Sequence, residues 1–316
     1  MSATEAFRFS GKLSCWHILL TALFTAGTAF GPHANASIVD VTAPTTSWTP
    51  ISYSSSNPDP SNDQQTGSSE GDIVGNALHP SVYTMFGDAG TPSTTDGNLA
   101  FRIRLGADVN PAGFKTAVFI GVDANRDGAL DLFIGVNNSG AADTIGIWNP
   151  GAGLNISPNT TTIVSTPLVT YTQTAANYNW AAVTLTNDPT VGTATDLDGG
   201  GQTDHFLSFS VSFSDVVMLL AARGITGFDE NSALAYVIAT ATQANSLNQD
   251  LNGVGKNYDG AATWSTLGVL SDGMTPAGAV VPEANPVLCG ILPLLLALVH
   301  DYFRRKTHRR SSSSLS

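Results

Sequence analysis

Cysteine is absent from most of this chain. The two cysteines of the 316-residue sequence, Cys15 and Cys289, lie near its ends, so residues 37–281 contain none. Without thiols this stretch forms no disulfide, no thiolate metal site and no cysteine nucleophile. Its fold must therefore depend on a hydrophobic core, on bound ions, or on both.

Basic residues are scarce as well. Residues 37–281 hold 22 acidic side chains but only 6 basic ones, a net charge of about −16, compared with −12 for the whole chain. Because a phosphate backbone attracts the opposite charge, nucleic acid is not expected as a partner, whereas cations suit this stretch.

Catalytic residue types are few. Only two histidines, His79 and His205, and two glutamates, Glu70 and Glu230, occur between residues 37 and 281. The paired acids of a glycoside hydrolase would therefore have to come from aspartate. We expect no enzyme activity; the alternative is a carbohydrate-active hydrolase that loses turnover on His205→Ala or Glu230→Gln.

The long apolar runs lie at the two ends of the chain. Near the N-terminus, Arg8 and Lys12 precede a mostly apolar stretch over residues 16–30, and Ala34-Asn35-Ala36 provides a small-residue cleavage site. This order predicts a cleaved signal peptide over residues 1–36, and hence export. The alternative is a buried helix at the start of a cytosolic domain.

The second run, Val287–Val299, has no polar face and is shorter than the ~20 residues of a full membrane span. Extended to Phe303, it reaches the low end of the lengths that span a bilayer. The basic cluster of residues 304–310 would stay on the cytoplasmic side. We predict a transmembrane helix over residues 287–303; the alternative is a C-terminal core helix.

Three parts therefore follow one another at the C-terminus: a motif over residues 281–284, the apolar helix and the basic tip. This order resembles the PEP-CTERM sorting signal, which has a Val-Pro-Glu-Pro-like motif, a short hydrophobic helix and an Arg-rich tip. The matching residues are Val281, Pro282 and Glu283 in the motif and Arg304 and Arg305 in the tip, while Ala284 stands where the family has a second proline.

This resemblance covers residues 276–316 and concerns sorting rather than activity. It implies that an exosortase-type sorting enzyme, a membrane protease-transpeptidase of Gram-negative bacteria, processes the tail. The protein would first be anchored in the inner membrane and would then reach the cell surface or the extracellular matrix.

Short strand patterns dominate the region between the two ends. Leu99–Leu105 alternates, with apolar residues on one face and Arg102 and Arg104 on the other. Residues 37–72 are expected to form an N-terminal strand and a polar linker. Further strands are predicted at residues 117–122, 132–136, 143–148, 162–164, 168–171, 180–185, 205–213 and 233–242.

One helix is predicted after the strand at residues 205–213. Ser214 can cap it, Asp215 favours its positive end, and Gly224 ends it. Many short strands with one short helix predict a mainly β fold, an antiparallel β-sandwich over residues 73–275.

Two Asp-rich loops carry the clearest chemical pattern. In the first, Asp123, Asn125, Asp127 and Asp131 stand at relative positions 1, 3, 5 and 9, with a glycine at 6 and the Ala129 carbonyl at 7. Calcium takes six to eight oxygen ligands, and this spacing curls such ligands around one point. The flanking segments are strands, so we predict a calcium loop at the tip of a β-hairpin.

The second loop repeats the pattern with Asp196, Asp198 and Asp204 at positions 1, 3 and 9. A third stretch, Asn248–Gly253, is a weaker copy. The alternative for all three is plain turns, because Asp, Asn and Gly suit turns without any metal.

An aromatic side chain next to a turn can stack on a sugar. Trp148 precedes Asn149-Pro150-Gly151 and is the best candidate for exposure; core packing is the alternative. Residues 95–215 also loosely resemble carbohydrate-binding or DOMON-type sandwich modules, which implies a β-sandwich but no particular ligand residue.

The hypothesis from sequence is a secreted, calcium-stabilised β-sandwich with a structural or adhesive role among exopolysaccharides. A hydrolase and a membrane-anchored periplasmic scaffold are the alternatives.

Overall fold

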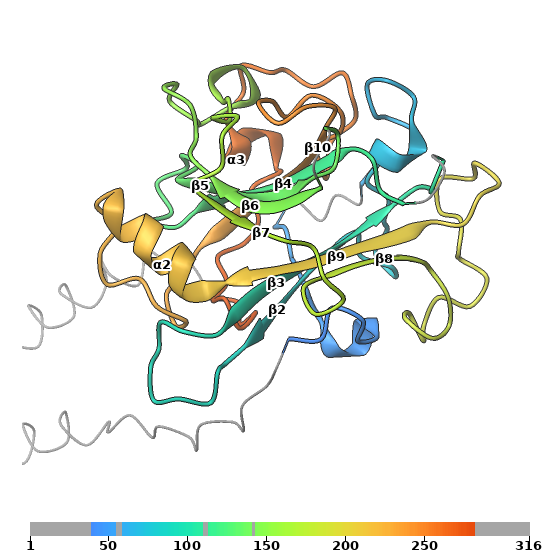
Figure 1. The fold of residues 1–316 in the computed structure, drawn as a ribbon. Helices are drawn as coiled ribbons and strands as arrows, with labels where there is room; N and C mark the ends of the chain where they lie inside the picture. The colour runs from blue at the N-terminus through green and yellow to red at the C-terminus, as the bar shows by residue number, and fades with distance from the viewer. Residues whose placement is uncertain (1–38, 55–58, 110–112, 141–142, 282–316) are drawn as a thin grey trace, which may run out of the picture. The chain divides into compact units, whose positions relative to one another are not determined.

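The chain is mainly β, with two antiparallel sheets that share one core, an arrangement that fits a β-sandwich (Figure 1). The computed structural model describes residues 39–54, 59–109, 113–140 and 143–281. The predicted signal peptide, transmembrane helix and basic tip lie outside these residues, as does the sorting motif apart from Val281. Within the described ranges, no helix is both long and apolar enough to cross a membrane.

Each sheet contains five strands. The first has the order β1-β2-β3-β9-β8 and the second the order β10-β4-β5-β6-β7, and all neighbours are antiparallel. The first sheet consists of β1 (Thr49–Pro50), β2 (Val82–Gly87), β3 (Asn98–Leu105), β9 (His205–Ser212) and β8 (Tyr178–Ala182). The second consists of β10 (Ala235–Ala241), β4 (Ala117–Asp123), β5 (Leu132–Asn137), β6 (Thr144–Trp148) and β7 (Val169–Tyr171).

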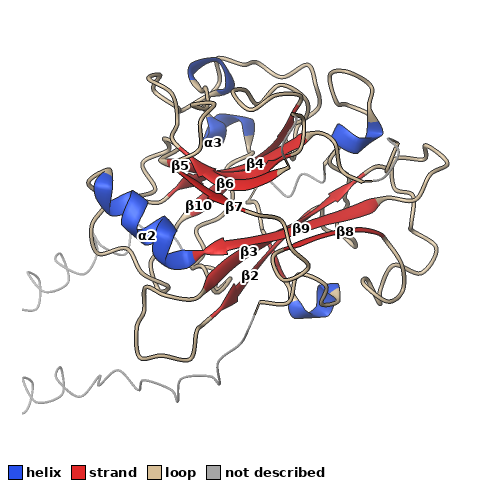
Figure 2. Cartoon of the chain, viewed as in Figure 1, coloured by secondary structure: helices blue, strands red, loops and turns tan. Residues whose placement is uncertain are grey.

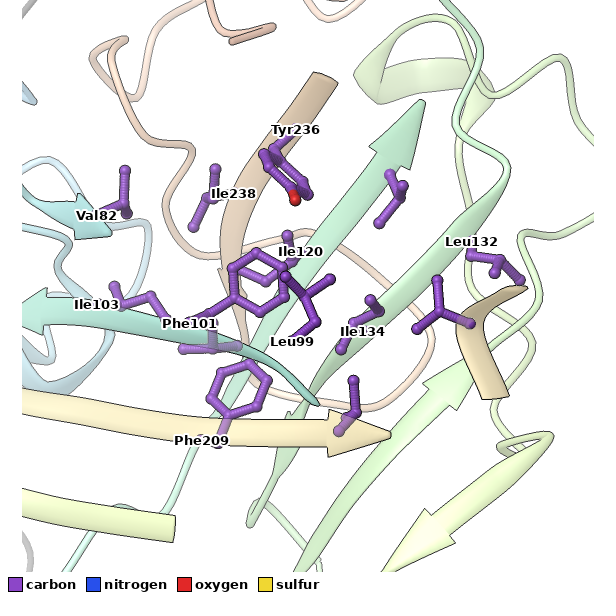
Figure 3. Close-up of a cluster of buried hydrophobic side chains, with 14 of the residues drawn as sticks. Val82, Leu99, Phe101, Ile103, Ile120, Leu132, Ile134, Phe209, Tyr236 and Ile238 are labelled. Atoms are coloured by element: carbon purple, nitrogen blue, oxygen red, sulfur yellow. The ribbon is translucent and has the colours of Figure 1, made fainter. Parts of the chain in front are cut away.

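The core between the sheets is formed by alternate residues of the central strands. Phe101 and Phe209 come from the first sheet and Ile120 and Ile134 from the second, and all four are fully buried (Figure 3). The ring of Phe101 meets that of Tyr236 edge-on across the sheets, with centroids 5.3 Å apart, a favoured aromatic geometry.

The outer faces of both sheets are buried too. On the second sheet, Phe119, Phe133 and Trp148 form a cluster with Trp264, the first residue of the short helix α3 (Trp264–Leu267) in the C-terminal part of the chain. On the first sheet, the N-terminal segment contributes Trp48 to a third apolar cluster. Because loops cover these faces, β4 and β10 are buried at every residue.

This double coverage explains two buried arginines. The alternation predicted for β3 is confirmed, but the face that carries Arg102 and Arg104 is not open to solvent, and both side chains are fully buried. The Arg102 guanidinium lies 4.4 Å from the centroid of the Trp48 ring, a cation–π contact. Arg104 pairs with Asp204 instead.

Few helices accompany the sheets (Figure 2). Helix α2 (Phe213–Ala222) follows β9, and the glycine after its C-cap, Gly224, has a φ of +91°, as a helix stop requires. The N-cap is Ser212 rather than the predicted Ser214, because β9 turns directly into the helix. Helix α3 (Trp264–Leu267) and three 3-10 turns, η1 (Thr45–Ser47), η2 (Ser69–Gly71) and η3 (Pro158–Thr160), complete the described elements.

The N-terminal part of the sandwich differs from the prediction. No strand forms over residues 39–41, and the sandwich begins at β1, whose partner β2 was not predicted. Part of the expected polar linker packs into the fold: Asp59, Asp63 and Asp72 are buried, although residues 60–62 and 65–67 are exposed. Polar composition suggested solvent exposure, but Asp72 accepts hydrogen bonds from the backbone N–H groups of Asn62 and Asp63, and Asp59 accepts one from Gly253.

Candidate metal centres

The first Asp-rich loop joins β4 to β5 at the tip of a hairpin, as predicted. Its turn depends on Arg126 and Gly128, which have φ values of +60° and +88°. Both carboxylate oxygens of Asp123 accept backbone hydrogen bonds, from Asp127 N at 3.1 Å and Gly128 N at 2.9 Å. Burial raises the pKa of Asp123 to about 6.

The remaining side chains of this loop also cap its backbone. Asn125 Oδ1 accepts from Asp127 N at 3.0 Å, and Asp131 Oδ2 accepts a backbone N–H at 2.9 Å. The carboxylates of Asp123, Asp127 and Asp131 do not meet at one point in the described structure. Calcium held here by these residues with the Ala129 carbonyl stays a prediction, and it would have to replace several of these bonds.

The second loop does bring its carboxylates together. Asp196, Asp198 and Asp204 each offer an oxygen, and these oxygens lie within 4.8 Å of one another. Two glycines with positive φ, Gly199 (+70°) and Gly201 (+78°), make the tight turn before β9. These three residues are hereafter named the calcium loop cluster, after the ion predicted for them from the sequence.

Unsatisfied oxygens mark this calcium loop cluster. Asp196 Oδ1 and Asp198 Oδ2 are buried and accept no hydrogen bond from the described residues. Asp204 is different, because Arg104 Nη2 lies 2.6 Å from its Oδ2. Burial, reinforced by the charge of Asp196, raises the pKa of Asp198 above its ordinary value.

A third group of carboxylates was missed at the sequence level. Asp59, Asp63 and Asp250, hereafter the buried aspartate cluster, also place one oxygen each within 4.8 Å of the others. The exposed fractions of these residues are 5%, 7% and 5%. Asp250 belongs to the weak third stretch, whereas Asp59 and Asp63 belong to the expected linker, and no local spacing links positions so far apart.

The buried aspartate cluster is strongly desolvated. Burial raises the pKa of Asp63 to about 6 and that of Asp250 to about 8, and neighbouring carboxylates add to both shifts. The pKa of Asp59 is raised as well, for the same reasons. Such shifts indicate that charge in this region requires protons or a cation for compensation.

The structure excludes Trp148 as a stacking platform for a sugar. Only 1% of this residue is exposed, and its ring meets that of Phe119 edge-on with centroids 5.2 Å apart. The turn after Trp148 does not expose it, because the C-terminal loops cover this face of the second sheet.

Neither histidine is arranged with a nucleophile. His79 Nδ1 lies 3.8 Å from a carboxylate oxygen of Asp188. The ring of His205 stacks on Trp180 with centroids 4.8 Å apart, and its Nδ1 lies 2.9 Å from Thr203 O. Residues 67–71 match the pattern G-x-S-x-G, but their serine opens the short turn η2 rather than a strand-to-helix elbow.

The structure defines a class: a mainly β protein with two antiparallel sheets and, among its described residues, two groups of three aspartates whose oxygens lie close together. No protein-family model, no curated protein and no solved structure matches the chain. Its function is therefore argued from its own residues.

Proposed function

We propose that this chain is an exported, calcium-stabilised β-sandwich protein, sorted by its C-terminus to the cell surface or the extracellular matrix. There it has a structural or adhesive role with exopolysaccharide. The observation that carries the proposal is the meeting of Asp196, Asp198 and Asp204 in a chain segment without cysteine.

The chemistry of the calcium loop cluster suits calcium. Carboxylate oxygens are hard ligands, which Ca²⁺ and Mg²⁺ prefer, whereas zinc favours nitrogen and sulfur. Asp196 Oδ1 and Asp198 Oδ2 have no hydrogen-bond partner to lose on metal binding. Ca²⁺ also tolerates irregular coordination geometry, whereas Mg²⁺ requires a nearly ideal octahedron.

Export and sorting are supported by the two ends of the sequence. The signal-like segment, residues 1–36, and the tail, residues 276–316, have the order of parts described above. Val281, the first residue of the sorting motif, is held to the sandwich by its N–H, which donates to Gly273 O at 2.7 Å.

Calcium binding by this cluster is tested with Asp198→Asn. The amide keeps the hydrogen bond from Gly200 N, 2.9 Å in the native protein, but removes a charged ligand. In titration calorimetry, we expect the wild-type chain to bind Ca²⁺ and Asp198→Asn to lose one bound ion. Asp143→Asn, a change at an exposed carboxylate, is the matched control. An unchanged number of ions in Asp198→Asn would remove the basis of the proposal.

The adhesive role is tested with exopolysaccharide from the native host. We expect the protein to sediment with the polysaccharide in Ca²⁺ and to remain in solution in EDTA. If the polysaccharide is not retained in either condition, the adhesive part of the proposal is wrong.

A further inference from the structure

The buried aspartate cluster joins two segments that are far apart in sequence. Asp59 and Asp63 lie in the segment before η2, and Asp250 lies in the turn after β10. Asp59 Oδ1 accepts from Gly253 N, and Asp250 Oδ2 accepts from Ile73 N, both at 2.6 Å. Each of these two carboxylates therefore holds the backbone of another segment with one of its oxygens.

Oxygens at the centre of the cluster have no donor. Neither carboxylate oxygen of Asp63, nor Asp59 Oδ2, accepts a hydrogen bond from the described residues. The side-chain oxygen of the adjacent Gln64, a residue only 5% exposed, has no partner either. A buried polar atom without a partner is unfavourable, and more so if it is charged, so three such carboxylate oxygens in this cluster indicate an additional group.

No basic side chain neutralises these charges. None of the four ion pairs found among the described residues involves Asp59, Asp63 or Asp250. Lys256 acts on Asp63 at longer range but is itself exposed. A fourth carboxylate, Asp72, is buried beside Asp63 and adds to the negative potential.

We propose that Asp59, Asp63 and Asp250 bind a divalent cation of the Ca²⁺ class, which fastens residues 59–64 to residues 249–253. The set contains only carboxylate oxygens, the hard ligands that Ca²⁺ prefers. Mg²⁺ fits less well, since it usually keeps several waters that a buried site does not accommodate easily. A cleft of about 430 Å³, lined by Asp63, Lys256 and Tyr258 among others, provides a path of entry.

The competing explanation is a cluster that shares protons and binds no ion. The two explanations differ for Asp63→Asn, a change that removes one ionisable group from the cluster and keeps the shape of the side chain. A proton-sharing cluster gains stability from this change at neutral pH, since one ionisable group is removed, and does not respond to Ca²⁺. A cation site loses its response to Ca²⁺.

This inference uses the calcium chemistry of the proposed function but different residues. The two sites are adjacent, because Asn62 Nδ2 donates to Asp198 O at 2.7 Å, so the variants must be compared directly. Loss of one bound Ca²⁺ in Asp63→Asn but none in Asp198→Asn would support the buried site and contradict the calcium loop cluster. The reverse result would overturn the buried site alone.

The experiment combines Ca²⁺ titration calorimetry with hydrogen exchange on the full chain. We expect Ca²⁺ at about 100 times its dissociation constant to slow exchange of the Ile73 and Gly253 amides about 100-fold, because the ion must leave before the segments separate. Asp63→Asn should lose this protection from exchange and should bind one Ca²⁺ fewer than the wild-type chain. Asp143→Asn should keep the wild-type protection and the wild-type number of bound ions.

Two results would overturn the inference: exchange at Ile73 and Gly253 that does not respond to Ca²⁺ in the wild-type chain, or an unchanged ion count in Asp63→Asn. If Asp63→Asn does not fold, the wild-type exchange measurement stands without any variant.

Discussion

At the scale of single residues, Arg104 holds three parts of the protein together. Its Nε and Nη2 lie 2.7 and 2.6 Å from Asp204 Oδ2, its Nη1 lies 3.9 Å from Asp188, and Nη2 also donates to Ala194 O. All three charged side chains are almost completely buried. The calcium loop cluster is therefore anchored to β3 through Asp204.

Arg104→Ala should lower the free energy of unfolding by about 3–5 kcal/mol, because it removes the guanidinium that neutralises the buried carboxylate of Asp204 and lies close to that of Asp188. Denaturant unfolding measures this change. The matched control is Lys115→Ala, whose partner Asp143 is exposed, and which should cost less than about 1 kcal/mol. Equal effects of the two changes would contradict the assigned role of Arg104.

Trp148 allows a test that separates packing from recognition. Trp148→Ala should lower the free energy of unfolding by about 3–5 kcal/mol, since it empties the centre of the outer cluster on the second sheet. Binding of exopolysaccharide per folded molecule should not change. A variant of wild-type stability with weakened polysaccharide binding would restore the sequence-based prediction for this residue.

At the scale of elements, the second sheet alternates glycine with aromatic residues on its outer face. Gly121 pairs with Phe133, and Gly135 pairs with Phe119. A Cβ atom on Gly135 would lie 2.2 Å from Val118 O and 3.0 Å from the Phe119 ring. The absence of side chains at the glycines therefore makes room for the rings.

Gly135→Ala should destabilise the protein by about 1–3 kcal/mol, because the backbone oxygen of the neighbouring strand cannot move aside without breaking the sheet. Gly140→Ala is the control, since a Cβ there meets nothing within 4 Å. Thermal unfolding of the two variants compares them. If Gly135→Ala and Gly140→Ala melt at the same temperature, the backbone at Val118 does not restrict residue 135 to glycine, which would contradict this prediction.

Strands with a regular alternation of apolar and polar residues could be predicted from the sequence. The loops that cover each face of these strands could not be predicted. The alternation of Leu99–Leu105 and the hairpin around Asp123 are local patterns, and both are confirmed. That the face of Arg102 is buried depends on Trp48, which lies more than 50 positions away. Sequence periodicity carries no information about which loop covers which face.

The same distinction separates the two carboxylate clusters. Asp196, Asp198 and Asp204 lie within nine positions, so turn geometry brings them together and spacing was informative. Asp59 and Asp250 meet only because the sandwich brings the segment before η2 beside the turn after β10. The polar composition of the first segment suggested a linker instead.

At the scale of the whole molecule, burial of carboxylates makes stability depend on pH. The pKa of Asp63 is raised to about 6 and that of Asp250 to about 8, from an ordinary value of 3.8. The folded state therefore binds more protons than the unfolded chain between about pH 4 and pH 8. In EDTA, the free energy of unfolding should fall as the pH rises through this window.

Urea unfolding at several pH values in EDTA checks this prediction. Saturating Ca²⁺ should make the free energy of unfolding fall less between pH 4 and pH 8, since the ion binds the ionised carboxylates. A free energy of unfolding that rises from pH 4 to pH 8 in EDTA would contradict the assignment of raised pKa values.

Processing of the two ends during export and sorting also concerns the whole molecule. In the native host, we expect a mature form that begins after residue 36 and ends near residues 281–284, found outside the cell or carrying an added group. Intact-mass measurement of the fractionated protein tests this. A form that still ends at Ser316 in the inner membrane would contradict the sorting proposal and favour a membrane-anchored scaffold.

The most direct test of the central claim, that calcium stabilises this cysteine-free sandwich, is the melting temperature of the chain in EDTA and after Ca²⁺ is restored. An ion that binds only the folded state stabilises it by about 2.7 kcal/mol at 100 times its dissociation constant. We predict a melting temperature that falls in EDTA and recovers fully with Ca²⁺. The same melting curve in both conditions would contradict the account.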